Sequence, residues 1–248
     1  MVNTELSNHL STAYSKAYPF PHIIIDNFFS DTDFLRKAID EIRNFDFWGF
    51  DNSDIVKMDG RQVNKFFTPW CQSNISDIAS QAPKAFEIMQ YLNSPELLKF
   101  LEELTGIPDL EPDDLFSGGG IHKIKSGGKL AIHSDYLMHP DKKMYRRINL
   151  LLYLNEDWNS NWGGDLELWD KGMTHCVSQI EPIFNRAVIF NTTYNSNHGH
   201  PQELKTPTDR DRLSFAMYYF TKEDPGEEGT PLHDHAIWKK PINSIFKV

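Results

Sequence analysis

Short apolar segments, separated by turn residues, fill the chain from Leu115 to Thr221. They predict eight strands, at about 116–125, 129–134, 146–154, 165–169, 175–183, 187–191, 196–202 and 212–221. Between them, turns are expected at Gly127-Gly128, Asn161 to Gly164, and Asn185-Arg186. Eight short strands of this kind predict a double-stranded β-helix, that is, a jelly-roll or cupin-like fold.

The chain before this run predicts one strand and several helices. Residues 20–29 are rich in β-branched side chains and predict a strand. A helix is expected from an N-cap at Ser30 to about Arg43, because apolar residues recur there at helical spacing. Further helices are expected over 76–91, with a break near Pro83, and over 94–105. The expected fold class is therefore mainly β, with N-terminal helices packed on one sheet.

Two segments are less regular. Residues 44–69 are interpreted as loop with short strands, either a lid over a site or a surface excursion. The charged tail, 222–248, is interpreted as loop that could cover a sheet. With no internal repeat or linker, residues 1–248 are expected to form a single domain. Its parts are an N-terminal strand and helical layer at 18–110, a β-helix core at 115–221 and the tail.

Composition excludes several classes of protein. The formal net charge of −10 argues against nucleic acid or an anionic membrane as the main partner. Two cysteines, Cys71 and Cys176, cannot make a disulfide framework and favour a reducing compartment. The N-terminus lacks the pattern of a signal peptide, and no stretch approaches the roughly 18 apolar residues that span a bilayer. We therefore expect a cytoplasmic protein.

One short motif carries metal chemistry. His133 and Asp135 stand two residues apart on a predicted strand, so both side chains point to the same face. A histidine from a distant strand, His198 or His200, would complete a set of two nitrogens and one oxygen. That set leaves coordination positions open, as in non-haem Fe(II) oxygenases. An arginine further on, Arg210 or Arg212, would supply a fork for the carboxylate of an organic cosubstrate.

Several motifs in this part of the chain also occur together in one known family. They lie at Gly118–Ile124, Gly127–Asp135, Arg147–Asn155, Trp162–Trp169, Pro182–Phe190, His198–Pro201 and Arg212–Phe220. In this order they resemble the prolyl 4-hydroxylase branch of the 2-oxoglutarate/Fe(II)-dependent oxygenase superfamily. Residues 20–29 also resemble the first strand of that family.

This resemblance implies a role for each matching residue. His133, Asp135 and His198 would be the iron ligands, and His200 a neighbouring packing residue. Arg212 would bind the C5 carboxylate of 2-oxoglutarate, leaving Arg210 in solvent. Tyr153 would contact the same carboxylate, and Ser214 would add a hydrogen bond. The implied cofactors are Fe(II), 2-oxoglutarate and O2, with ascorbate as a candidate reductant.

Other residues receive weaker interpretations. His122 and Lys125 lie on the strand that lines the active-site mouth in relatives, which makes them candidates for substrate contact. His139 and His175 are interpreted as ordinary surface or loop histidines. The large aromatic residues Trp162, Trp169 and Phe190 are interpreted as core.

The resemblance implies hydroxylation of an unactivated C–H bond, coupled to conversion of 2-oxoglutarate into succinate and CO2. Peptidyl or free proline is the expected substrate, and a non-proline small molecule or a sugar-linked group is the alternative. Desaturation or ring closure would use the same site. Two other classes are a zinc hydrolase with the same three ligands and a non-catalytic binding protein on the same fold. The sequence predicts no oligomeric state.

Overall fold

The computed structural model describes residues 7–44, 62–67, 72–117, 119–140, 142–226 and 235–242. Most of the predicted segment at 44–69 lies outside these ranges, as do Cys71 and parts of the tail. The helices are α1 (Ser7–Lys16), α2 (Thr32–Arg43), α4 (Gln72–Gln81), α5 (Pro83–Leu92) and α6 (Pro95–Thr105). The strands are β1 (His22–Ile25), β2 (Gln62–Phe67), β3 (Glu111–Pro112), β4 (Gly120–Ser134), β5 (Tyr145–Tyr153), β6 (Leu166–Trp169), β7 (Cys176–Ile180), β8 (Ala187–Asn191), β9 (His198–His200), β10 (Arg212–Thr221) and β11 (Ile237–Trp238).

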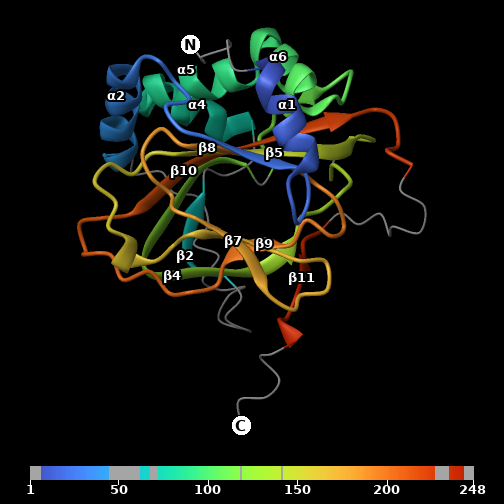
Figure 1. The fold of residues 1–248 in the computed structure, drawn as a ribbon. Coiled ribbons are helices and arrows are strands. Elements are labelled where there is room, and N and C mark those ends of the chain that lie inside the picture. The colour runs from blue at the N-terminus through green and yellow to red at the C-terminus, as the bar shows by residue number, and fades with distance from the viewer. Residues whose placement is uncertain are drawn as a thin grey trace.

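The strands form a curled antiparallel sheet in the order β1-β8-β5-β10-β4-β9-β6-β7. In addition, β2 and β11 pair with β4, and β3 pairs with β10. Long strand β4 joins the two layers of the fold, because its first part pairs with β10 and its last part with β9. Figure 1 shows the helices covering the β8-β5-β10 layer, with β4, β9 and β7 forming the opposite layer. The predicted jelly-roll is confirmed.

Alternation along the strands separates the hydrophobic core from the interior of the jelly-roll. On β10, Leu213, Phe215 and Met217 join the core that packs against the helices. The intervening Arg212 and Ser214 line a cavity on the other face of the layer. Successive side chains of a strand point to opposite faces, so one strand serves the core and the cavity together.

Capping residues and a proline set the ends of several helices. The side chain of Ser94 accepts a hydrogen bond from Leu97 N–H, and Gly106 at φ 72° ends α6, as the sequence predicts. The predicted break near Pro83 separates α4 from α5. None of the helices in the described ranges is both long and apolar enough to cross a lipid bilayer.

Two expectations about local structure are wrong, and one helix was not expected. Gly127-Gly128 is not a turn, because β4 continues through both residues while it bends from one layer to the other. The N-cap of α2 is Asp31 rather than Ser30, since the Asp31 carboxylate accepts the Phe34 N–H. Helix α1 was not expected; its Tyr14 is 1% exposed, so packing against the core stabilises a polar segment as a helix.

The side chain of Asn185, just before β8, forms two hydrogen bonds with the segment that connects β1 to α2. Its side-chain oxygen accepts the Phe29 N–H at 2.8 Å, and its amide donates to the Phe29 carbonyl at 2.8 Å. Asn185 is buried and adopts φ 58°, a conformation that asparagine tolerates better than most residues.

We expect Asn185→Ala to lower the free energy of unfolding by about 2–4 kcal/mol, because two buried hydrogen bonds are lost and alanine is strained at this φ. Urea denaturation measures the change. Asn185→Gly is the matched control, since it loses the same hydrogen bonds without the backbone strain and should cost less. Losses below about 1 kcal/mol for both variants would contradict this role.

Candidate active site

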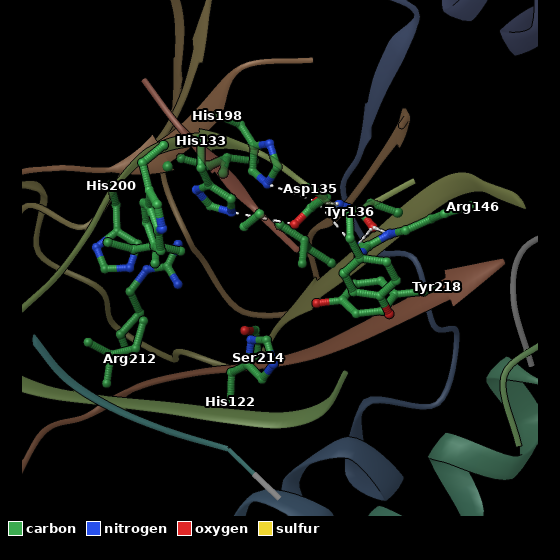
Figure 2. A pocket seen from close by; sticks show the side chains of 18 residues that line it. His122, His133, Asp135, Tyr136, Arg146, His198, His200, Arg212, Ser214 and Tyr218 are labelled. Carbon is green, nitrogen blue, oxygen red and sulfur yellow. Dashed lines mark hydrogen bonds and ion pairs between the residues drawn. The ribbon is translucent and has the colours of Figure 1, made fainter. Parts of the chain in front are cut away.

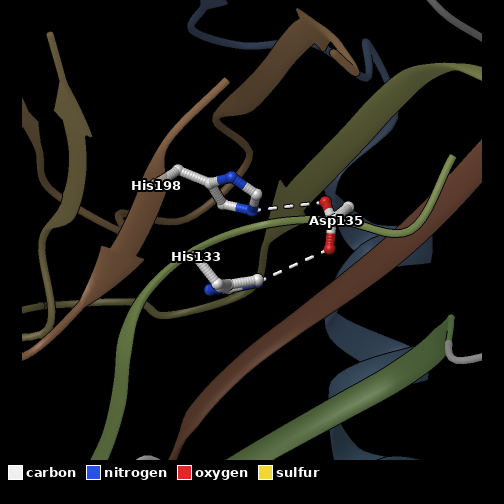
Figure 3. Close-up of side chains that lie close together, drawn as sticks. All are labelled: His133, Asp135 and His198. Atoms are coloured by element: carbon white, nitrogen blue, oxygen red, sulfur yellow. Dashed lines mark ion pairs between the residues drawn. The ribbon is translucent and has the colours of Figure 1, made fainter. Parts of the chain in front are cut away.

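Two histidines and one aspartate converge between the layers of the jelly-roll. His133 lies near the end of β4, Asp135 follows that strand, and His198 begins β9, paired directly with His133. Their potential ligand atoms all lie within 4.8 Å of one another, and all three residues are buried. The Asp135 carboxylate is 3.5 Å from His133 Nε2 and 3.4 Å from His198 Nε2 (Figure 3). The three residues could together hold one metal ion.

The two imidazoles are held in the tautomer that a metal ligand needs. His133 Nδ1 is 2.9 Å from the Ala131 carbonyl, and His198 Nδ1 is 2.9 Å from the Ser196 carbonyl. A carbonyl only accepts hydrogen bonds, so in the neutral ring Nδ1 carries the proton and Nε2 keeps its lone pair. Burial lowers the pKa of His198 to about 4, although the Asp135 carboxylate opposes this shift. His198 is therefore neutral at physiological pH and able to coordinate.

Asp135 is oriented by two residues of β5 that sequence reasoning missed. Asn149 Nδ2 donates to Asp135 Oδ2 at 2.6 Å, and Arg146 Nη2 donates to the same oxygen at 3.2 Å. Burial by itself would raise the pKa of Asp135, but Arg146 and His198 beside it hold that pKa well below its usual range. The carboxylate is therefore charged, as a metal ligand must be.

Gly199 allows β9 to approach β4 closely. A Cβ atom at this position would lie 2.8 Å from the carbonyl oxygens of both Leu130 and Ala131. These are backbone atoms, so only glycine fits without moving a strand. Gly199 therefore keeps His198 beside His133.

Arg212 lies at the other end of the cavity. Its Nε donates to the Gly164 carbonyl at 2.8 Å, and its Nη2 donates to the Tyr153 hydroxyl at 3.4 Å. Arg212 is 4% exposed, yet it makes no ion pair with a carboxylate among the described residues. A buried guanidinium with only neutral partners fits an anion supplied by a ligand. Ser214, two residues along β10, lines the same cavity.

The cavity between the two ends has a volume of about 160 Å³. Figure 2 shows Arg212 and His200 at one end and Tyr136, Arg146 and Tyr218 at the other. The Arg146 guanidinium carbon lies 3.3 Å from the Tyr218 ring centroid and 4.6 Å from that of Tyr136. Its Nη1 is buried and has no hydrogen-bond partner among the described residues. This end of the cavity is therefore bordered by a buried guanidinium and two aromatic rings.

The structure separates the remaining candidates. His122 and His200 are buried and line the cavity, whereas Lys125 is exposed and does not line it. Arg210 is half-buried and lies outside the cavity. Phe190 is core, as expected, and its ring lies 4.8 Å from that of His198.

His139 was interpreted as an ordinary surface or loop histidine; it lies in the connection between β4 and β5, but it is not at the surface. It is buried, and its Nε2 lies 3.2 Å from the Asp113 carboxylate and 3.3 Å from Ser117 Oγ. His175, in contrast, is exposed, as expected. Trp162 and Trp169 are half-buried and belong to neither core cluster of the described residues, so they are not core.

A signal for some of the missed residues exists in the sequence. Asn149, Leu151 and Tyr153 alternate along β5, so the period of the strand places Asn149 on the interior face with Tyr153. Arg146 breaks this alternation because the pairing of β5 with β10 shifts by one residue there. Its inward position could not be inferred from spacing.

The fold and this cluster define a class of protein. A jelly-roll with two imidazoles, one carboxylate and open positions suits non-haem Fe(II) oxygenases. The family model of the 2OG-Fe(II) oxygenase superfamily matches residues 119–226. Over these residues the chain is similar to this superfamily, and along most of its length it is similar to a prolyl hydroxylase.

Individual relatives show how far the similarity extends. Prolyl 3-hydroxylase OGFOD1 of Mus musculus is 27% identical over 92% of this chain. The chain spans 39% of that protein and 42% of its Xenopus laevis counterpart. A Pseudomonas putida prolyl-4-hydroxylase structure matches 87% of this chain and 100% of its own with TM-score 0.56 and 18% identity. HygX from Streptomyces hygroscopicus, with nickel and 2-oxoglutarate bound, matches 94% of this chain and 98% of its own with TM-score 0.58 and 12% identity.

We expect Gly164→Ala to weaken 2-oxoglutarate binding by about 10-fold or more while leaving metal affinity within about threefold. A Cβ atom there would lie 2.5 Å from Leu204 Cδ2 and 3.1 Å from Arg212 Cδ. Isothermal titration under nitrogen, with Mn(II) as the metal, measures both affinities. Gly163→Ala is the matched control, because its φ of 71° is similar but its Cβ would meet nothing closer than 3.9 Å. Equal effects of the two variants would contradict a specific role for Gly164.

We expect Asn149→Ala to raise the dissociation constant of Mn(II) by about 10-fold, because it removes a hydrogen bond that orients the Asp135 carboxylate. Titration calorimetry of the purified protein measures this constant. His175→Ala, at an exposed histidine, is the control and should leave metal affinity unchanged. Unchanged affinity in Asn149→Ala would show that Arg146 alone is sufficient to orient Asp135.

Proposed function

We propose that this protein is an Fe(II)- and 2-oxoglutarate-dependent dioxygenase that hydroxylates a prolyl residue. The observation that carries the proposal is the arrangement of one cavity. It places the His133–Asp135–His198 cluster in the same space as Arg212, a buried cation without a carboxylate partner among the described residues. A metal site and a free carboxylate-binding group in one cavity suit a cosubstrate that chelates metal at one end and carries a carboxylate at the other.

The residues present fit the metal. Two unprotonated Nε2 atoms and one charged carboxylate converge, and these three donors leave positions for further ligands. We assign His133, Asp135 and His198 as the iron ligands. Bound Fe(II) would supply the redox chemistry by which one atom of O2 enters the substrate C–H bond and the other enters succinate, with release of CO2.

Arg212 would hold the distal carboxylate of 2-oxoglutarate. Its guanidinium is fixed by the Gly164 carbonyl and by the Tyr153 hydroxyl, so the fork is already oriented before a ligand arrives. Burial strengthens the charge pair that would form, because solvent screens it little. Tyr153 does not line the cavity and would act mainly through Arg212, with Ser214 as a further hydrogen-bonding group.

The other end of the cavity supports a peptide substrate. Tyr136 and Tyr218 offer apolar surface beside the Arg146 Nη1 donor, which suits an apolar ring followed by an amide carbonyl. A prolyl residue in a peptide has this chemistry. The similarity to OGFOD1 and to the prolyl-4-hydroxylase points the same way. The jelly-roll alone does not choose the substrate, since HygX has also been crystallised with hygromycin B.

The remaining parts of the proposal follow from the chemistry and composition. O2 would be the oxidant, ascorbate a reductant that keeps iron as Fe(II), and the cytoplasm the location, on the basis of two cysteines in the chain. A zinc hydrolase would need the three ligands but not the Arg212–Tyr153 pair. A non-catalytic protein would need neither, so the oxygenase accounts for more of the site.

We expect protein purified anaerobically with Fe(II) to form succinate from 2-oxoglutarate on exposure to air. A pool of acetylated pentapeptides with a central proline and randomised flanks should gain one oxygen atom per turnover, measured by mass spectrometry. His133→Ala should abolish both products, because the metal loses a ligand. Arg212→Met should raise the KM for 2-oxoglutarate by about 30-fold or more, because a buried charge pair is lost.

Two variants serve as matched controls. Arg210→Met removes a similar cation outside the cavity and should leave the KM for 2-oxoglutarate nearly unchanged. His175→Ala removes an exposed histidine and should retain turnover. Absence of succinate together with absence of Fe(II) and 2-oxoglutarate binding would overturn the proposal. Hydroxylation of another added compound but not of the peptide pool would overturn the prolyl assignment alone.

A further inference from the structure

The C-terminal segment returns to the His133–Asp135–His198 cluster as strand β11. Ile237 pairs with Ser134 of β4, and Trp238 pairs with His133. The pairing is extended by Lys239, whose N–H donates to the Ile132 carbonyl at 2.8 Å. Further along, Ile242 N–H donates to the Met173 carbonyl at 3.0 Å, in the β6–β7 connection. Four residues of the tail are thus fixed to the layer that carries the proposed iron ligands.

Trp238 ends a row of aromatic rings that runs from β8, in the opposite layer, to the paired strands β9, β4 and β11. His133 pairs with His198 on one side and with Trp238 on the other. The ring centroids are 4.8 Å apart for Phe190 and His198, 4.5 Å for His198 and His133, and 5.2 Å for His133 and Trp238. Cross-strand neighbours of this kind fix one another in place. The indole is therefore held against a proposed iron ligand.

The indole also has surface left for a ligand. Trp238 is half-buried rather than buried, and it lines the cavity together with Ala236, two residues before it on the same face of the segment. A side chain in contact with a ligand imidazole lies next to the space in which a reacting C–H bond must lie. Part of the indole therefore borders the cavity that contains the proposed iron ligands.

Trp238 is also far along β4 from the proposed cosubstrate end. Arg212 pairs with Ile124 and Trp238 with His133, nine residues further along β4, beyond the bend between the layers. The two residues are attached to different arms of that strand. A contact of Trp238 with the substrate is therefore compatible with 2-oxoglutarate at Arg212.

We propose that Trp238 is a specificity-determining residue that stacks on the target residue of the substrate. This inference rests on the proposed prolyl hydroxylase function. An aromatic face packs well on a saturated five-membered ring, whose C–H groups carry slight positive charge against the negative face of the indole. Trp238 thereby places the pyrrolidine ring beside the proposed iron ligands, and the small side chain of Ala236 leaves room for that ring.

The test compares Trp238→Ala and Trp238→Phe with wild type, using the proline pentapeptide pool as the probe. Trp238→Ala should lower kcat/KM for the pool by about 10-fold or more, whereas Trp238→Phe, which keeps an aromatic face, should stay within about threefold. The dissociation constants of Mn(II) and 2-oxoglutarate should change by less than about threefold in both variants. A thermal melt of each variant checks that it is folded.

Three further measurements keep the inference open to refutation. Ile237→Ala is the matched control, because its side chain lies on the same strand but does not line the cavity, and it should retain peptide hydroxylation. Ala236→Leu should lower peptide hydroxylation by filling the cavity without removing the indole. Co(II) should quench tryptophan fluorescence more in wild type than in Trp238→Phe, because the indole lies next to His133.

The outcomes separate this inference from the proposed function. Hydroxylation by wild type with unchanged kcat/KM in Trp238→Ala overturns the role of Trp238 alone. A parallel loss of Mn(II) affinity in Trp238→Ala also overturns it, since the indole would then act only by orienting His133. Equal losses in Ile237→Ala would assign the effect to the strand rather than to the ring. Failure of wild type to hydroxylate the pool removes the proposed prolyl substrate, and this inference with it.

Discussion

The close contact of β9 with β4 at Gly199 is the constraint on which the site depends. The two strands come from distant parts of the chain, and each contributes a histidine to the cluster. A side chain at Gly199 would meet two backbone carbonyl oxygens at 2.8 Å, which cannot move aside without separating the strands. The distance between His133 and His198 is therefore set by backbone contact. Side-chain packing then adds the row of rings that ends at Trp238.

The helical layer makes a polar interior possible. The core that stabilises the fold lies between the helices and one face of the β8-β5-β10 layer, with residues such as Leu150 and Phe215 fully buried there. The interior of the jelly-roll is thereby free to hold charged and polar groups, including Arg146, Asp135 and Arg212. Such groups destabilise a fold unless they are paired. Because the main core lies under the helices and not in the cavity, most of the stabilising apolar contacts do not involve the polar groups of the cavity.

Local patterns in the sequence predicted much of this structure, and long-range pairing explains what they missed. Strands β8 and β10 have the predicted bounds, because each is a continuous apolar run between clear turn residues. The bend in β4 looks like a turn in the sequence, because a glycine pair such as Gly127-Gly128 suits both a turn between two strands and a bend within one strand. His139 is buried beside Asp113, a contact across 26 residues of sequence that local patterns do not predict. Trp238 lies at the site because the tail pairs with β4, and no local sequence pattern predicts that pairing.

Two buried arginines in one cavity show why the arrangement favours a carboxylate cosubstrate. Arg146 is paired with Asp135 and lies against the rings of Tyr136 and Tyr218, so its charge is already balanced. Arg212 is equally buried, but its hydrogen-bond partners are a carbonyl and a hydroxyl, and it makes no ion pair with a carboxylate among the described residues. Leaving one cation unpaired costs free energy in the absence of ligand. A bound carboxylate would remove that cost, and the affinity for such a ligand would rise accordingly. One arginine is thus paired with Asp135, and the other has the partners that the proposed carboxylate-binding role requires.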